Sequence, residues 1–195
     1  MGLWSTGDGH TLEDREERSG MQLDPQETAL LVIDVQTGLF HRSRPIFRAE
    51  ALLETINGLS SRFRSAGAAV VFIQHANKGM LRYGTPDWQL HEELLVEEED
   101  IRIEKEHGNA FEETRLGEAM NTRGILNLVI TGLVTHGCVR ATCEGAFVLG
   151  YRTILVEDAH SNYHEQAETL IQEWNEKLSQ GWAECCRADD IQFQT

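Results

Sequence analysis

The chain has 195 residues, of which 41% are hydrophobic and 25% are charged, and its formal net charge is −15 at pH 7. These values are typical of a soluble globular protein with a single core. The negative charge disfavours nucleic acid and anionic membrane surfaces as partners, because both attract clusters of Lys and Arg, and no apolar run approaches the roughly 18 residues of a membrane span.

The N-terminal residues 1–22 are polar and lack the basic segment followed by an apolar core that marks a signal peptide. We expect them to form a loose arm ahead of one domain over residues 23–195. We therefore expect a cytoplasmic protein that acts on a small-molecule substrate. As partners we expect further copies of the same chain, in a homo-oligomer (dimer or tetramer), and no nucleic acid or membrane.

After the arm, apolar runs of strand length alternate with segments of helical periodicity, and glycines follow three of the helical segments. This alternation is typical of βα units that build a parallel sheet, so the predicted fold class is α/β. The predicted strands are 29–35, 68–75, 100–105, 126–132, 153–158 and 182–188, and the predicted helices lie near 48–66, 112–123, 137–150 and 164–179.

One connection, residues 76–100, is much longer than the others. Loops of this length in compact domains are usually either functional or disordered. The apolar side chains of Tyr83, Trp88 and Leu90 favour packing against the domain over disorder. We therefore expect this loop to contribute to a binding site.

The four cysteines do not suggest a disulfide framework. Cys185 and Cys186 are adjacent, and Cys138 and Cys143 lie five residues apart on a predicted helix, so they point in different directions. Zinc-ligand spacing is also absent from the sequence. We expect reduced thiols, no metal and no cofactor.

Three polar residues follow predicted strands. Asp34 ends the first strand, Lys105 ends the third and Cys138 follows the fourth, where "TGLVTHGC" breaks into a helix. The carboxyl ends of parallel strands meet at one edge of the sheet, where ligands bind if the strand order reverses there. With a strand order of 3-2-1-4-5-6, Asp34 and Cys138 would face each other across the reversal.

Each of these residues also has an ordinary structural interpretation. Cys138 could be a buried small hydrophobe, Asp34 a turn residue, and Lys105 a surface residue that extends to solvent. Gly137, directly before the cysteine, instead suits a turn that exposes the thiol at a helix N-terminus. At that position the helix dipole, with the ammonium of Lys105, would lower the pKa of the thiol.

The motifs "LLVIDVQTGLF", "IEKEHGNAFEETRL" and "VITGLVTHGCVRATCEGAFVLGYRTILVEDAHS" resemble those of the isochorismatase-like cysteine hydrolases, a family that includes nicotinamidases and N-carbamoylsarcosine amidohydrolases. The similarity extends over roughly residues 27–193. It implies a three-layer α/β fold, with a six-stranded, mostly parallel sheet of order 3-2-1-4-5-6 and helices on both faces. It also implies a catalytic triad of Asp34, Lys105 and Cys138.

By the same resemblance, the backbone N–H groups of Val134 and Cys138 form an oxyanion hole, and the Leu133–Val134 peptide bond is cis. The implied reaction is hydrolysis of a C–N bond through a thioester on Cys138, with Asp34 as general base and then general acid. Candidate substrates are small amides, ureido or carbamoyl compounds and lactams. A streptothricin-type cyclic amide is the specific alternative, which the negative charge of the chain would suit.

Two departures from the motifs of known subfamilies narrow the expected reaction. Where metal-dependent nicotinamidases carry an Asp-x-His motif, this chain has "FIQHANKGM", with His75 at the position of the metal-binding Asp. His75, His91 and His136 lie at unrelated positions without metal-ligand spacing, so they are interpreted as turn or interface residues. Isochorismatases proper lack the nucleophilic cysteine, so Cys138 favours hydrolysis of a C–N bond.

Two alternatives from other classes remain. The chain could be a non-catalytic binding module of the same fold, or a redox protein that pairs Cys138 with Cys143. The predicted substrate pocket is formed by residues that flank the catalytic motifs or lie on the long loop, namely Phe40, Tyr83, Trp88 and His136.

Overall fold

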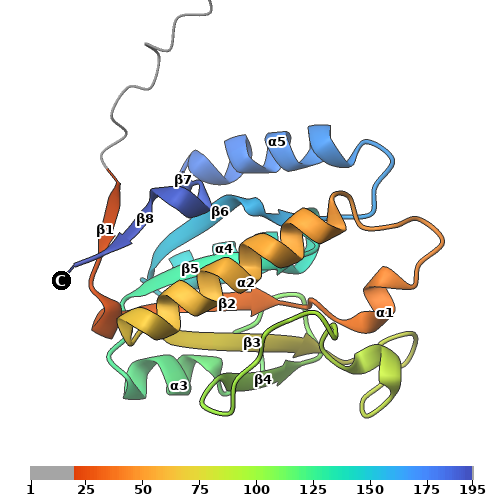
Figure 1. The fold of residues 1–195 in the computed structure, drawn as a ribbon, viewed down its shortest axis with the longest axis horizontal. Helices are drawn as coiled ribbons and strands as arrows, with labels where there is room; N and C mark the ends of the chain where they lie inside the picture. Colours follow the sequence, from red (N-terminus) through yellow and green to blue (C-terminus); the bar gives the residue numbers. More distant parts are fainter. Residues whose placement is uncertain (1–19, 195) are drawn as a thin grey trace, which may run out of the picture.

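The computed structural model of the protein describes residues 20–194, and its centre is a six-stranded parallel sheet (Figure 1). The strand order is β4-β3-β2-β5-β6-β7, so the predicted order 3-2-1-4-5-6 is confirmed. The strands of this sheet are β2 (Thr28–Ile33), β3 (Ala69–His75), β4 (Ile101–Lys105), β5 (Asn127–Leu133), β6 (Arg152–Ser161) and β7 (Glu184–Cys186).

The central strands are buried on both faces, as their continuous apolar sequences require. All six residues of β2 are buried, and successive side chains point to opposite faces. Leu30 and Val32 belong to one hydrophobic cluster, whereas Leu31 and Ile33 belong to the other. The sheet therefore has a separate apolar core on each side.

Helices cover both faces of the sheet. Helix α2 (Ala49–Ala66) covers one face, and its apolar residues at helical spacing, among them Leu52, Ile56 and Phe63, are buried there. Gly67 ends this helix in the left-handed conformation, with φ of 79°. Residues of α3 (Leu116–Thr122), α4 (Arg140–Val148) and α5 (Ala167–Ser179) contribute to the cluster on the other face.

The N-terminal part of the chain adds a small second sheet. Strand β1 (Met21–Leu23) pairs in parallel with β8 (Ile191–Phe193), a pairing that the sequence analysis did not predict. Most of the arm predicted over residues 1–22 lies outside the described residues, but Met21 and Gln22 belong to β1. Two residues assigned to the predicted arm therefore belong to a strand.

The long loop 76–100 is packed against the domain, as predicted. It contains only the short helix η2 (Pro86–Trp88), and Trp88 is 8% exposed. The backbone of the loop is joined to the segment after β2, since Thr37 N–H donates to Gln89 O and His91 N–H donates to Val35 O, both at 2.9 Å. No helix in the described part of the chain is long and apolar enough to cross a membrane.

Candidate active site

The three residues predicted as a triad lie together at the carboxyl edge of the sheet. Asp34 directly follows β2, Lys105 is the last residue of β4, and Cys138 lies in the turn η3 (Thr135–Val139) that joins β5 to α4. Strands β2 and β5 are neighbours at the point where the strand order reverses. As expected for a parallel sheet, the reversal brings residues distant in sequence to one place.

Asp34 and Lys105 form a buried ion pair. Lys105 Nζ lies 2.8 Å from Asp34 Oδ2, and the two side chains are 0% and 4% exposed. Asp34 has a positive φ of 52°, and its N–H donates to Ile73 O on β3. Its second carboxylate oxygen, Oδ1, is buried and has no hydrogen-bond partner in the structure.

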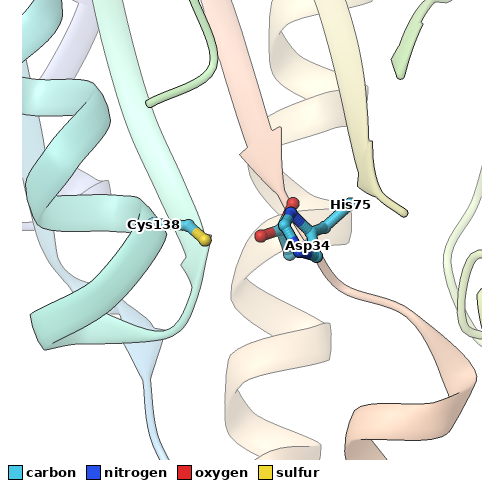
Figure 2. Close-up of side chains that lie close together, drawn as sticks. All are labelled: Asp34, His75 and Cys138. Atoms are coloured by element: carbon cyan, nitrogen blue, oxygen red, sulfur yellow. The ribbon is translucent and has the colours of Figure 1, made fainter. Parts of the chain in front are cut away.

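Cys138 projects from the start of the helical segment toward Asp34 (Figure 2). One ligand atom each of Asp34, His75 and Cys138, the last being Sγ, lie within 4.8 Å of one another. The Leu133–Val134 peptide bond before this turn is cis, as the family resemblance implied. Because Asp34 Oδ1 has no hydrogen-bond partner, it can accept a hydrogen bond from the Cys138 thiol or from a substrate.

Gly132 allows β5, the strand that leads into the Cys138 turn, to approach β2 closely. Its φ is 110°, a conformation that favours glycine, and a Cβ at this position would collide with the backbone of Ile33, the residue before Asp34. Glycine is therefore required here by both conformation and space.

The pKa of the Cys138 thiol is raised to about 12, foremost by burial and next by the negative charge of Asp34, while Lys105 acts in the opposite direction. This direction contradicts the expectation that the helix terminus and Lys105 lower the thiol pKa. The sequence could not reveal that Lys105 is already paired with Asp34, nor how deeply the thiol is buried. At neutral pH the resting cysteine is consequently a thiol beside a carboxylate.

His75, the last residue of β3, lies in the same cluster as the three predicted triad residues. Its ring Nδ1 lies 3.3 Å from Lys105 Nζ. The pKa of His75 is lowered, first by burial and then by the charge of Lys105. Its position at the end of a strand beside Asp34 was the available signal, and the sequence analysis had interpreted it only as a turn or interface residue.

The cluster of Asp34, His75 and Cys138 contains atom types that bind metals, but its surroundings disfavour a cation. The Lys105 ammonium contacts both Asp34 and His75, and its positive charge would oppose a metal ion placed between them. Within residues 20–194, His91 and His136 do not belong to a group of three possible metal ligands. The donor set therefore fits a hydrogen-bonded triad better than a metal centre.

Gln36 joins the site to the long loop. Its side-chain amide accepts a hydrogen bond from the N–H of His75 at 2.8 Å and donates to the carbonyl of His75 at 3.0 Å. The same NH₂ group donates to Trp88 O at 2.6 Å. A fully buried glutamine thus fixes the end of β3 and the middle of the loop relative to Asp34.

A second buried polar network lies beneath the cysteine turn. Asn175 Oδ1, on α5, is an acceptor 2.8 Å from His160 Nε2, so the ring proton is on Nε2. The His160 Nδ1 atom, 3.0 Å from Thr135 Oγ1, then accepts the threonine hydroxyl. Burial lowers the pKa of His160 to about 4, so its ring is neutral at pH 7.

The four predicted pocket residues take part in three separate aromatic contacts. Phe40 packs against His91 with 4.1 Å between ring centroids, Tyr83 packs against Trp88 at 4.7 Å, and His136 approaches His164 at 6.5 Å. Tyr83 is 64% exposed, whereas Trp88 is buried. Their role in binding substrate stays a prediction.

A hollow of about 390 Å³ adjoins Lys105. Tyr83 lines it as well, whereas Asp34 and Cys138 do not. Its other lining residues are Ala76, Glu104, Glu106, His107 and Glu113, so its walls carry three carboxylates.

Fold and site together define an α/β protein of the isochorismatase class. The family model for the isochorismatase domain matches residues 28–184, and the chain belongs to this family. A solved isochorismatase family protein superposes with a TM-score of 0.77 at 29% identity, covering 82% of this chain and 98% of that one. The resemblance inferred from the three sequence motifs is thereby confirmed.

Two relatives carry specific names. A streptothricin hydrolase of Streptomyces noursei is 34% identical over 137 residues, which cover 69% of this chain and 50% of that protein. A ureidoacrylate amidohydrolase RutB of Caulobacter vibrioides is 26% identical over 203 residues, covering 83% of this chain and 89% of that protein. The chain thus spans about half the length of the streptothricin hydrolase that it matches.

Proposed function

We propose that the protein hydrolyses a C–N bond of a small amide, a ureido or carbamoyl compound, or a lactam through a thioester on Cys138. The observation that carries the proposal is the position of the Cys138 thiol beside the buried Asp34 carboxylate, of which one oxygen is held by Lys105 and the other, Oδ1, has no hydrogen-bond partner. A buried carboxylate oxygen without a partner is unfavourable unless a substrate or a thiol proton satisfies it.

In the first step, Asp34 takes the thiol proton while Cys138 Sγ attacks the carbonyl carbon of the substrate. A direct transfer suits a thiol whose pKa is raised to about 12, because it avoids a free thiolate intermediate. The tetrahedral oxyanion would accept hydrogen bonds from the backbone N–H groups of Val134 and Cys138. Asp34 then gives its proton to the departing nitrogen, the C–N bond breaks and the thioester forms.

In the second step, water attacks the thioester carbon while Asp34 takes one of its protons. The C–S bond breaks, the carboxylic acid leaves, and the proton returns to sulfur, which restores the resting thiol. Lys105 keeps its positive charge throughout and balances the charge of the buried carboxylate beside it. No redox change occurs and no cofactor is needed, so we propose a cofactor-free hydrolase.

A cyclic amide of the streptothricin type is the more specific candidate substrate. The relative named streptothricin hydrolase supports it, and so do the three glutamates that line the hollow beside Lys105, since carboxylates attract a cationic substrate. The relative named ureidoacrylate amidohydrolase supports the ureido class instead. We propose further that the protein is cytoplasmic and forms a homo-oligomer.

The test combines two assays over one panel of substrates. Ammonia release detects hydrolysis of primary amides and ureido compounds, whereas opening of a lactam adds one water without releasing a fragment and requires mass spectrometry. Cys138→Ala should lower kcat by at least about a thousandfold, as expected for loss of a catalytic nucleophile. Cys185→Ala, which removes another partly buried thiol outside the site, serves as the matched control.

The outcomes separate the three classes of protein. Turnover that depends on Cys138 supports the hydrolase, and the substrate that reacts identifies the bond. More than a tenth of wild-type kcat in Cys138→Ala would overturn the thioester mechanism. A folded chain that turns over no member of the panel would favour the binding module, whereas a Cys138–Cys143 disulfide found by mass spectrometry would favour the redox protein.

A further inference from the structure

The ammonium of Lys105 has three N–H donors and three acceptors. These are Asp34 Oδ2 at 2.8 Å, the backbone carbonyl of His107 at 3.1 Å and the ring Nδ1 of His75 at 3.3 Å. Because the lysine side chain is 0% exposed, bulk water does not replace any of them. Loss of one acceptor would leave a buried charged donor unsatisfied.

The contact with Lys105 fixes the protonation of His75. An ammonium can only donate, so a hydrogen bond at this contact requires the lone pair of Nδ1 and places the single ring proton on Nε2. A doubly protonated ring would place two cations at hydrogen-bond distance. Asp34, Glu106 and a hydrogen bond to the backbone of His107 act in the opposite direction on the His75 pKa, but burial and Lys105 outweigh them, and the lowered pKa agrees with a neutral ring.

His75 is itself held rigidly. Both backbone polar groups of this residue bond to the side-chain amide of Gln36, which is fully buried and also donates to Trp88 O. These bonds fix the backbone of the last residue of β3. That strand lies between β2, which leads to Asp34, and β4, which ends at Lys105. A side chain that orients a catalytic residue must itself be held in place, and these hydrogen bonds hold His75.

We infer that His75 is a positioning residue of the triad, which holds the Lys105 ammonium on Asp34 Oδ2 through its Nδ1 acceptor. Held in this way, the ammonium leaves Asp34 Oδ1 free for the Cys138 thiol. Without the acceptor, the ammonium turns away from Oδ2 to satisfy its third N–H, and the carboxylate loses both its orientation and its compensating charge. This role deepens the proposed function and rests on it.

Two substitutions separate the two ring nitrogens. The Asn Oδ1 atom is as many bonds from Cβ as His Nδ1, so His75→Asn restores an acceptor for Lys105. The Gln amide reaches instead toward the Nε2 position, so His75→Gln retains a polar group without that acceptor. His41→Asn, at an exposed histidine that bonds to Asp87, controls for the loss of an imidazole at the same edge of the sheet.

His75→Gln and His75→Ala should lower kcat about tenfold or more with little change in KM, in line with the loss of one hydrogen bond to a charged group. His75→Asn should recover most of that loss, and His41→Asn should match wild type. Equal kcat in wild type and His75→Ala overturns the inference. A His75→Gln enzyme that is more active than His75→Asn also overturns it, because the Nε2 side would then be the one that matters.

A second readout does not depend on turnover. The rate at which iodoacetamide alkylates Cys138, followed by peptide mass spectrometry, should change in His75→Gln and return toward the wild-type value in His75→Asn. If Cys138→Ala keeps its activity, the proposed function fails, but the alkylation series still decides whether His75 positions Lys105. An alkylation rate that is the same in all three proteins contradicts the positioning role.

Discussion

Asp34 and Lys105 make a 2.8 Å contact although their strands, β2 and β4, are not neighbours in the sheet. Strand β3 lies between them, and its terminal residue His75 contributes to the same cluster. The lysine side chain spans the width of one strand to reach the carboxylate. The charge balance at the site therefore depends on three adjacent strands ending at the same level.

Lys105→Met tests this balance, because it keeps the length of the apolar stem and removes the charge. Lys105 is the charged group that lowers the pKa of Cys138, so its loss should raise that pKa further. Alkylation by iodoacetamide at a fixed pH should slow by about tenfold for each unit of increase. An unchanged rate would show that the ammonium does not act on the thiol.

Asp34→Asn should separate thiol reactivity from turnover. Asp34 raises the pKa of Cys138, so its neutralisation should lower that pKa and accelerate alkylation at a fixed pH. Hydrolysis should fall by about 10²- to 10⁴-fold, because the group that transfers the proton is missing. Added to Lys105→Met, the same substitution should restore part of the alkylation rate but no hydrolysis. Turnover near the wild-type rate in Asp34→Asn would exclude it as the general base.

Chelation should leave activity unchanged. The Lys105 ammonium contacts both Asp34 and His75, so its positive charge would repel a metal ion bound at this cluster and weaken metal affinity. The measurement is kcat after dialysis against a strong chelator, with metal content determined on the same sample. Loss of activity that zinc or iron restores would mean that these side chains act as metal ligands.

His160 should make the stability of the fold depend on pH. Its pKa falls from 6.5 to about 4 on folding because of burial, so the unfolded chain binds more protons between these values. The free energy of unfolding should therefore decrease as the pH falls from about 6.5 to about 4 and then level off, with a total contribution of about 3 kcal/mol.

Urea denaturation over this pH range measures the effect. His160→Gln should reduce the slope by the equivalent of about one proton, whereas His41→Gln, at an exposed histidine, should keep the slope of wild type. The same slope in His160→Gln and wild type would show that His160 is not protonated preferentially in the unfolded chain.

The sheet could be predicted from the sequence because its strands are continuous apolar runs separated by helical segments. The order of the strands and the position of Asp34, Lys105 and Cys138 at one edge followed from the motifs. Helix boundaries were less accurate, since α3 begins at Leu116 and not near residue 112. The pairing of β1 with β8 was missed because strands of three residues carry too little periodicity to be recognised.

Within the site, the sequence indicated which residues meet but not how they interact. The raised thiol pKa depends on burial and on the pairing of Lys105 with Asp34, which are properties of the tertiary structure. Gln36, Thr135 and His160 were missed for a related reason. Buried polar residues of this kind are recognised by their partners, and those partners lie 15 or more positions away in sequence.

The contact of Gly132 with Ile33 brings the backbones of β5 and β2 together directly before the Cys138 turn and Asp34. A single methyl group at residue 132 would push these two strands apart at the level of the site. The spacing between the Cys138 turn and Asp34 therefore depends on the absence of a side chain at one position.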